Sequence, residues 1–151
     1  MKKFLLLTCL LTGLGFTKAQ NVNPDEILGI WKSNLEKGHV EITKQGNVYS
    51  GKIVWLKVPN YPDGTAKMDK NNPDKNMRSE PLMGLLVLKD LVFVNGHWEN
   101  GSIYDPESGK TYSCRITFKD NTLNLRGYIG LSQIGRTQTW SRENSLAIQN
   151  P

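Results

Sequence analysis

Residues 111–129, TYSCRITFKDNTLNLRGYI, contain the clearest structural signal in this chain, because apolar and polar residues alternate there in two runs. Apolar side chains recur from Tyr112 to Phe118 in the first run and from Leu123 to Ile129 in the second. A period of two places alternate side chains on opposite faces of a β-strand. The segment 119–121, Lys-Asp-Asn, lies between the runs as a tight turn. The stretch therefore predicts an antiparallel hairpin with one apolar face.

The same alternation recurs along most of the chain, with turn residues between the runs. Gln45-Gly46-Asn47 and Asn95-Gly96 each join two runs, and Asn-Gly supplies the positive φ angles that a two-residue hairpin needs. The predicted strands lie at roughly 29–34, 38–45, 48–57, 83–88, 91–94, 97–104, 111–119 and 122–130, with a ninth at 136–142. The one helical signal is a single turn at 23–28, where an Asn cap precedes a proline and two acidic residues.

Short connections between many strands predict an all-β fold with an antiparallel up-and-down meander. A meander of about eight strands removes its open edges when it closes into a small β-barrel, and a two-sheet sandwich is the alternative. We expect one barrel domain over residues 24–142 and a frayed C-terminal tail at 143–151.

The N-terminus has the pattern of a signal peptide over residues 1–19. Two lysines precede an apolar run at 4–11, and Ala19 supplies the small residue before a cleavage site. The run is shorter than the ~20 residues that span a bilayer. Cys9 lies inside the run rather than after it, which argues against a lipid anchor. We therefore expect an exported protein, periplasmic or secreted, with no stable membrane anchor after cleavage.

Removal of residues 1–19 changes what the composition implies. The formal net charge falls from +5 to +2, because three of the 19 basic residues lie in that segment and all 14 acidic residues lie outside it. The charge that remains indicates no nucleic-acid partner. Cys114 is then the only cysteine, so we expect no internal disulfide and a domain that depends on its core alone.

Features of the first and the last predicted strand resemble the lipocalin and fatty-acid-binding superfamily. Gly29-Ile30-Trp31 begins the first strand, and Arg142 ends the last. In that superfamily a tryptophan plugs the closed end of the barrel and an arginine stacks on it, an arrangement that a cation–π contact stabilises. The resemblance implies a lipocalin-like barrel in which Gly29, Trp31 and Arg142 have structural roles.

The chain from Ile27 to Arg142 also resembles a more specific family, the exported bacterial proteins catalogued as domain of unknown function 2147. The matching blocks are 29–31, 51–56, 69–78, 81–84, 98–106, 109–112, 126–130 and 135–140. This family has no assigned activity. The resemblance therefore implies a barrel and a location in the cell envelope, and indicates no reaction.

Catalytic and metal-binding patterns are weak in this sequence. His39 and His97 each follow a turn glycine, which predicts exposed histidines at strand edges rather than a catalytic base. Cys114 lies on an apolar strand face, which favours a buried and inert thiol. Oxygen-bearing residues at 69–74 could attract calcium, but interleaved lysines and turn hydrogen bonds explain the same segment. We expect no catalytic residue, no metal and no cofactor.

A ligand-binding site at the barrel mouth is the remaining prospect, built from aromatic and polar residues near loops. A few polar groups there would orient a mostly apolar ligand. The candidate residues are Trp55, Asp69, Asn72, Asp74, Arg78, Tyr104, Asp105, Tyr128 and Arg136. Arg78 and Arg136 could bind a carboxylate or phosphate in bidentate fashion, or could instead pair with neighbouring aspartates. In the simpler interpretation these groups form salt bridges and turn caps among themselves.

Residues 58–81 form a long connection with several prolines, and its length and balanced charge predict an ordered loop over one end of the barrel. Three functional hypotheses follow. The leading one is a non-enzymatic binding protein of the cell envelope for a small amphipathic or lipid-like ligand. The second is an interaction or structural module that docks a protein partner, of a kind the sequence does not indicate, through loop 58–81. An enzyme that uses Asp, Tyr and Arg ranks last.

Overall fold

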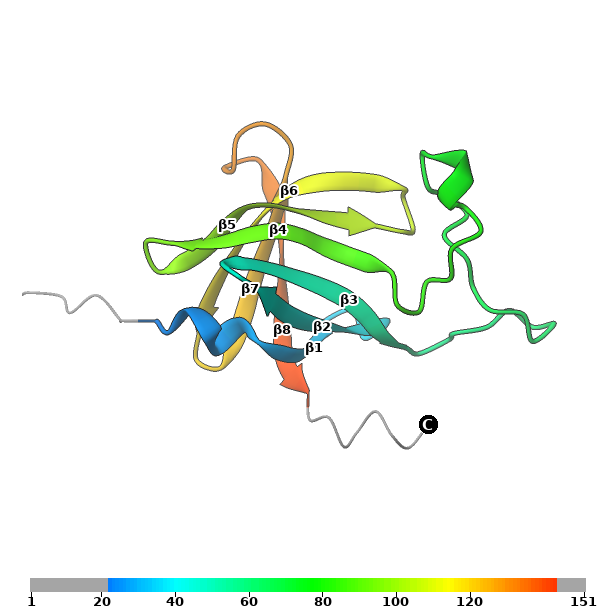
Figure 1. Ribbon diagram of the computed structural model, residues 1–151, viewed down its shortest axis with the longest axis horizontal. Helices are drawn as coiled ribbons and strands as arrows, with labels where there is room; N and C mark the ends of the chain where they lie inside the picture. Colours follow the sequence, from blue (N-terminus) through cyan, green and yellow to red (C-terminus); the bar gives the residue numbers. More distant parts are fainter. Residues whose placement is uncertain (1–21, 144–151) are drawn as a thin grey trace, which may run out of the picture.

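Eight antiparallel strands close into a barrel in the computed structural model, which describes residues 22–143 (Figure 1). Each strand pairs with the next one along the chain, and β8 pairs with β1 to complete the ring. The strands are β1 Gly29–Ser33, β2 Gly38–Gln45, β3 Val48–Leu56, β4 Leu86–Val94, β5 His97–Asp105, β6 Lys110–Lys119, β7 Thr122–Tyr128 and β8 Gly135–Glu143. The predicted all-β meander and its closure are confirmed, and the two-sheet sandwich is wrong.

Two expectations from the sequence concern segments at the ends of the chain. The predicted signal peptide at 1–19 lies outside the described residues, as does the predicted tail except for Glu143, the last residue of β8. Two short 3-10 helices accompany the barrel, η1 Pro24–Ile27 and η2 Lys75–Met77. Within residues 22–143, neither these turns nor any other helix has the length and apolar character needed to cross a membrane.

The strand count differs from the sequence pattern at one place. The segments predicted at 83–88 and 91–94 belong to a single strand, β4. The backbone leaves the extended conformation at Asp90, where φ is +58°. This irregularity breaks the alternation, so that Leu88 and Leu91 are both fully buried although three positions separate them. A pattern of strict period two therefore divides β4 into two apparent strands.

The closed end of the barrel is the end covered by η1, opposite the long β3–β4 connection (Figure 1). Ile27 of η1 is fully buried, and its carbonyl oxygen accepts a 2.7 Å hydrogen bond from the Trp31 indole. The Trp98 indole donates to the Pro24 carbonyl at 3.2 Å. Asp25 accepts from the Tyr49 hydroxyl at 2.8 Å. These bonds join the helical turn to three inward side chains and fill this half of the barrel.

Arg142 of β8 joins the last strand to Trp31 and to the end of η1 at the closed end of the barrel. Its guanidinium carbon lies 4.3 Å from the centroid of the Trp31 ring. Nη1 donates to the Leu28 carbonyl at 2.8 Å, and Nη2 donates to the Glu26 carbonyl at 2.6 Å. Gly29 has φ +117°, and a Cβ there would lie 3.0 Å from the guanidinium. The glycine is therefore required both by the backbone conformation and by the close approach of the arginine.

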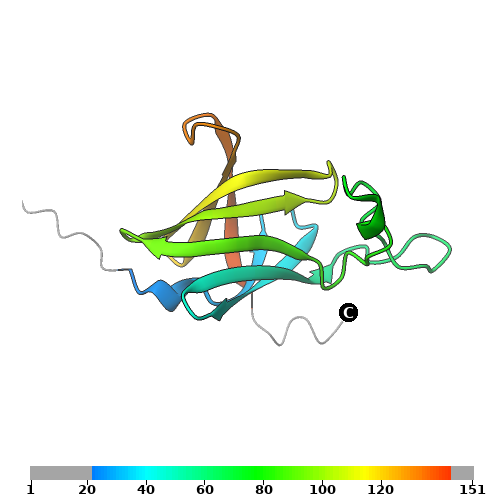
Figure 2. The same ribbon diagram turned by 45° about the horizontal axis from the view of Figure 1, so that its top comes forward.

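The open end carries the connections β1–β2, β3–β4, β5–β6 and β7–β8. The longest is the β3–β4 connection, residues 57–85, which extends beyond the barrel at this end (Figures 1 and 2). Backbone hydrogen bonds fold it back on itself, including Lys67 N to the Pro59 carbonyl at 2.9 Å and Leu82 N to the Lys67 carbonyl at 2.8 Å. The connection is thus an ordered loop of the kind that its prolines predict.

Substitution of Arg142 by methionine should lower the free energy of unfolding by roughly 2 kcal/mol, because it removes one cation–π contact and two hydrogen bonds to carbonyls. Urea denaturation followed by tryptophan fluorescence measures the change. Arg136→Met, the same substitution on the exposed part of β8, is the control and should leave stability nearly unchanged. Equal effects of the two substitutions would show that the contacts of Arg142 at the closed end do not stabilise the fold.

Candidate ligand-binding site

The open half of the barrel contains a cavity, here called the mouth cavity, made of two adjoining chambers. The first chamber has a volume of about 220 Å³ and is lined mainly from β1 to β4. Its buried wall includes Val40, Ile53 and Trp140, and Leu82 of the long loop contributes one edge. The packed core therefore ends at these residues, and the space beyond them opens to solvent at the barrel mouth.

The second chamber has a volume of about 470 Å³ and is lined from β5 to β8. Tyr112, Leu125 and Gly127 form its inner wall, and the β7–β8 loop forms part of its rim. The two chambers share three residues, Ile103, Asp105 and Gln138, so they adjoin across the mouth. Each wall is mostly apolar with a few polar groups, which is the usual character of a small-molecule site.

Three polar side chains of the mouth cavity differ in how far they are engaged. Asp105 accepts from the Glu107 backbone N–H at 3.0 Å and from the Ser108 hydroxyl at 2.6 Å, so it holds its own turn. Gln138 accepts from the Trp140 indole at 3.2 Å. The Arg136 side chain makes no hydrogen bond or ion pair with any residue from 22 to 143. It is the cation in the second chamber that remains available to a bound anion.

Asp69 is fully buried in the long loop and does not itself line the mouth cavity, whereas its partner Tyr104 lines the first chamber. Its carboxyl group accepts from the Tyr104 hydroxyl and from the Asn72 amide, both at 2.7 Å. Burial of the phenol and its hydrogen bond to Asp69 raise the pKa of Tyr104 well above its usual range. Tyr104 is therefore protonated at neutral pH and acts as a donor that ties β5 to the loop.

Asp74 and Arg78 are also engaged within the loop. The Asp74 carboxyl accepts from the Asn76 backbone N–H at 2.9 Å and caps η2. Arg78 donates from Nε to the Asn72 carbonyl at 2.7 Å. The structure therefore does not bring Asp69, Asp74 or Arg78 to the barrel mouth. The simpler interpretation, in which such groups stabilise turns, describes these three residues.

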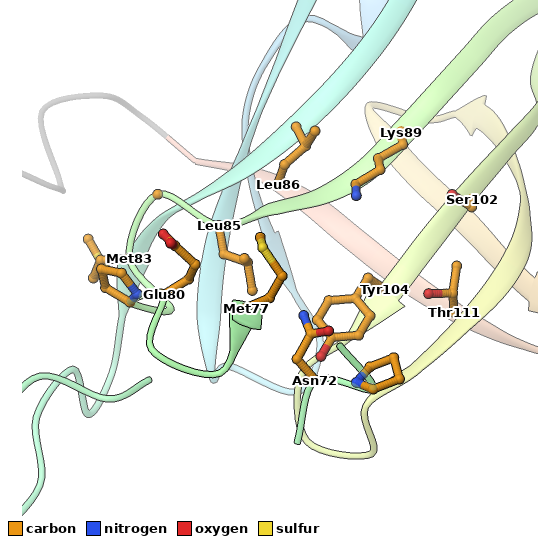
Figure 3. A pocket seen from close by; sticks show the side chains of 13 residues that line it. Asn72, Met77, Glu80, Met83, Leu85, Leu86, Lys89, Ser102, Tyr104 and Thr111 are labelled. Atoms are coloured by element: carbon orange, nitrogen blue, oxygen red, sulfur yellow. The ribbon is translucent and has the colours of Figure 1, made fainter. Parts of the chain in front are cut away.

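The long loop instead forms a second hollow, here called the outer groove, on the outside of β4, β5 and β6. It has a volume of about 570 Å³. Asn72 and Tyr104 belong to its lining, and Figure 3 shows Met77 of η2 pointing into it between Leu85 and Tyr104. Lys89 supplies a cation at its far side. No sequence pattern indicated this groove, because it depends on how the loop packs back against the sheet.

Trp55 and the histidines occupy positions that differ from the expected ones. Trp55 lines neither the mouth cavity nor the outer groove, and its ring stacks on His39 at a centroid distance of 4.4 Å. His39 is buried, so the prediction of an exposed histidine is wrong there. The register of β2 and β3 shifts between His39 and Val40, which lets both residues be buried. His97 is half-buried, 2.7 Å from the Glu99 carboxylate.

Two further predicted positions have clear structural environments. Tyr128 ends β7, pairs with Gly135 and lines the second chamber. Cys114 is fully buried, and burial raises the pKa of its thiol to about 12. A thiol with that pKa is protonated at neutral pH, which agrees with the prediction of an inert core cysteine. Among residues 22–143, no three His, Cys, Asp or Glu side chains are grouped to hold a metal ion.

Sequence reasoning missed several residues that line the mouth cavity, above all Gln138, Ile103 and Gly127. Alternation along β5, β7 and β8 gives the inward direction of each of them. What alternation does not give is the height along the barrel at which the core ends. The number of large side chains on each strand, taken level by level, is the signal that could have found the cavity.

A closed eight-stranded meander with one filled end and one hollow end defines a lipocalin-like barrel. The solved structure of protein HP1028 from Helicobacter pylori, described as belonging to the lipocalin family, is similar to this chain. The TM-score is 0.69 and the sequence identity 26%, over 82% of this chain and 87% of that one. The family model described as "Uncharacterized protein conserved in bacteria (DUF2147)" matches residues 29–142, and the chain belongs to this family. No curated protein matches the chain.

Tyr104→Phe should destabilise the protein by roughly 1–3 kcal/mol, because the buried Asp69 carboxyl loses one of its donors. Urea denaturation measures the global change, and limited proteolysis within residues 57–85 reports loosening of the loop. Tyr61→Phe is the matched control, since the Tyr61 hydroxyl makes no hydrogen bond in the described part of the chain. A similar small effect of both substitutions would show that the Tyr104–Asp69 bond does not hold the loop.

Stability should depend on pH through His39, whose pKa burial lowers from 6.5. Below pH 6.5 the unfolded chain takes up a proton that the folded chain resists. The contribution is therefore complete above pH 6.5 and is lost as the pH falls from there through the lowered pKa. His39→Phe keeps the stacking partner of Trp55 and removes the titration. The urea midpoint should then fall less steeply with acid than in the wild type, and parallel pH profiles would refute this assignment.

Proposed function

We propose that the protein is an exported, non-enzymatic binding protein that holds a small amphipathic or lipid-like ligand in the mouth cavity. The observation that carries the proposal is the mouth cavity in the open half of the barrel, next to a core of buried side chains at the closed end. A barrel of eight strands is narrow enough to be filled by its own side chains. Here the second chamber alone has about 470 Å³ of space, within the range of small-molecule sites.

The distribution of polar groups supports an amphipathic ligand with an anionic head. The inner walls are formed by Ile53, Leu125 and similar side chains, which suit an apolar body. The Arg136 guanidinium lies at the rim without a partner among residues 22–143, and this planar group can bind a carboxylate or phosphate through two hydrogen bonds. Asp105 and Gln138 lie between the chambers, where each retains capacity for a polar contact with the ligand.

Export remains part of the proposal and rests on the N-terminal sequence. The lysine pair, the short apolar run and Ala19 have the order of a cleavable signal. The described part of the chain has a single cysteine, Cys114, so its fold requires no oxidising compartment and is compatible with one. We place the mature protein in the periplasm or outside the cell. Fractionation of the native host, with an antibody against the barrel, tests this placement, and recovery in the cytosol alone would overturn it.

Gly127→Leu tests the cavity directly. A Cβ at Gly127 would meet Ile103 and Tyr112 at 3.6 Å, an ordinary contact distance, so a larger side chain extends into the second chamber without a backbone clash. We expect native mass spectrometry of protein from its own host to show a co-purifying small molecule on the wild type and none on the variant. A cooperative thermal unfolding transition verifies that the variant is folded.

The same experiment has outcomes that contradict the proposal. A ligand of equal occupancy on the wild type and on Gly127→Leu would place the ligand outside the second chamber. A wild-type protein that carries no molecule and gains no stability from any long-chain carboxylate or phosphate would leave the cavity without its proposed role.

The two arginines that the sequence proposed as anion ligands should now behave differently. Arg136→Gln should weaken binding of a long-chain carboxylate roughly 10- to 100-fold, because a charge-assisted hydrogen bond contributes about 1.5–3 kcal/mol. Arg78→Gln should leave binding unchanged, since Arg78 is engaged by the Asn72 carbonyl in the long loop. Isothermal titration calorimetry measures both affinities. Equal losses would show that nonspecific attraction by positive charge, rather than the position of Arg136, determines affinity.

A second candidate function is partner docking through loop 58–81, and the outer groove is the observation that favours it. The groove is lined by Met77 and Met83, flexible side chains that adapt to varied apolar partners. Replacement of loop 58–81 by a short Gly-Ser linker should then abolish capture of a partner from envelope extracts while the barrel stays folded. Unchanged capture would exclude this role. An enzyme that uses Asp, Tyr and Arg remains the third alternative, and the donor role of Tyr104 gives it no support.

A further inference from the structure

The β7–β8 loop, residues 129–134, exposes three large apolar side chains at the rim of the mouth cavity. Ile129, Leu131 and Ile134 are 70%, 68% and 73% exposed. A single exposed aliphatic residue is ordinary on a protein surface. Three of them within six residues form a cluster, and such clusters usually mark a surface that contacts something else.

Hydrogen bonds hold this loop in a defined shape. Arg126 donates from Nε to the Ser132 carbonyl at 2.6 Å, from Nη2 to the Gln133 carbonyl at 2.8 Å and from Nη1 to the Thr137 hydroxyl at 2.9 Å. Ile134 N–H donates to the Leu131 carbonyl at 3.0 Å. The loop, drawn in orange, stands clear of the barrel in Figures 1 and 2. The apolar side chains are thus presented by a built turn that projects into solvent.

The charged residues in the chain segment that contains the loop all have the same sign. From Asn121 to Arg142 the chain contains three arginines and no acidic residue. Two of these arginines, Arg126 and Arg136, lie at the base of the loop on β7 and β8. Asp105, the acidic residue that lines the adjacent chamber, uses both carboxyl oxygens in its own turn. The loop therefore combines an apolar tip with a cationic base.

We propose that loop 129–134 docks the protein on a membrane surface that contains anionic phospholipids. The tip would enter the interfacial region, and Arg126 and Arg136 would lie at the level of the headgroup phosphates. Interfacial binding depends on this combination of buried apolar area and attraction to anionic headgroups. A projecting tip of six residues suits a lipid interface better than a stable protein interface, which takes about 800 Å² from each partner. Docking in this way would turn the rim of the second chamber toward the membrane.

Flotation with unilamellar vesicles tests this surface. The probes are vesicles of phosphatidylglycerol with phosphatidylethanolamine, and vesicles of phosphatidylcholine alone. The wild type should float with the anionic vesicles, and salt should release it. Ile129→Ser, Leu131→Ser and Ile134→Ser combined should reduce the bound fraction roughly tenfold or more, because the apolar area that enters the interface is lost.

The control carries three serines at other exposed apolar positions, Val58, Met77 and Met83, all in the β3–β4 loop. It should float as the wild type does, and thermal midpoints verify that both variants are folded. Absence of wild-type flotation, or equal loss in the two variants, would overturn the proposal. So would concentration-dependent self-association of the wild type that the 129–134 variant abolishes, because the loop would then be an interface between copies of the chain. Because Ile129 and Ile134 also line the second chamber, native mass spectrometry of each variant reports ligand occupancy separately from flotation.

Discussion

Closure of β8 onto β1 is the constraint on which the rest of this structure depends. It fixes the number of strands at eight, and a ring of that size leaves an interior about as wide as the side chains that point into it. Whether the interior is solid or hollow then depends on side-chain size at each level. At the closed end Trp31, Trp98 and Tyr49 fill the ring. At the open end Gly127 occupies an inward position, and the second chamber extends over the space that a larger side chain there would fill.

The protein uses polar side chains in two contrasting ways. In the long loop, Asp69, Asp74 and Arg78 direct their polar atoms to neighbours in the loop or on the adjacent strand. For the buried Asp69 carboxyl, an unmet hydrogen bond would cost free energy. At the barrel rim Arg136 has no such partner in the described part of the chain. In the sequence, the loop residues and Arg136 carry the same signal, which is a charged residue close to a predicted loop. Only the folded position separates a charge that stabilises the structure from one that is free to bind.

Much of the fold could be predicted from the sequence, since alternation on segments such as 111–129 gives both strand identity and inward direction. Arg142, the predicted stacking partner of Trp31, lies on the tryptophan ring. Gly29 leaves room for its guanidinium, because a Cβ there would lie 3.0 Å from Nη1. Prediction failed where the backbone departs from ideal pleating. The positive φ at Asp90 made one strand look like two, and the register shift beside His39 buried a residue that a turn position marks as exposed. Such irregularities depend on contacts between strands, and alternation within one strand cannot contain them.

The cavity and the projecting loop are parts of one continuous apolar surface. Ile129 and Ile134 line the rim of the second chamber and also belong to the exposed tip of the β7–β8 loop. A ligand with an apolar body that leaves the chamber through water exposes surface at roughly 25 cal/mol per Å². In the proposed docking, a path along the side chains that would enter the lipid interface avoids most of that exposure. This geometry gives a physical reason for a barrel to keep aliphatic residues in a rigid, solvent-exposed turn, where aggregation would otherwise select against them.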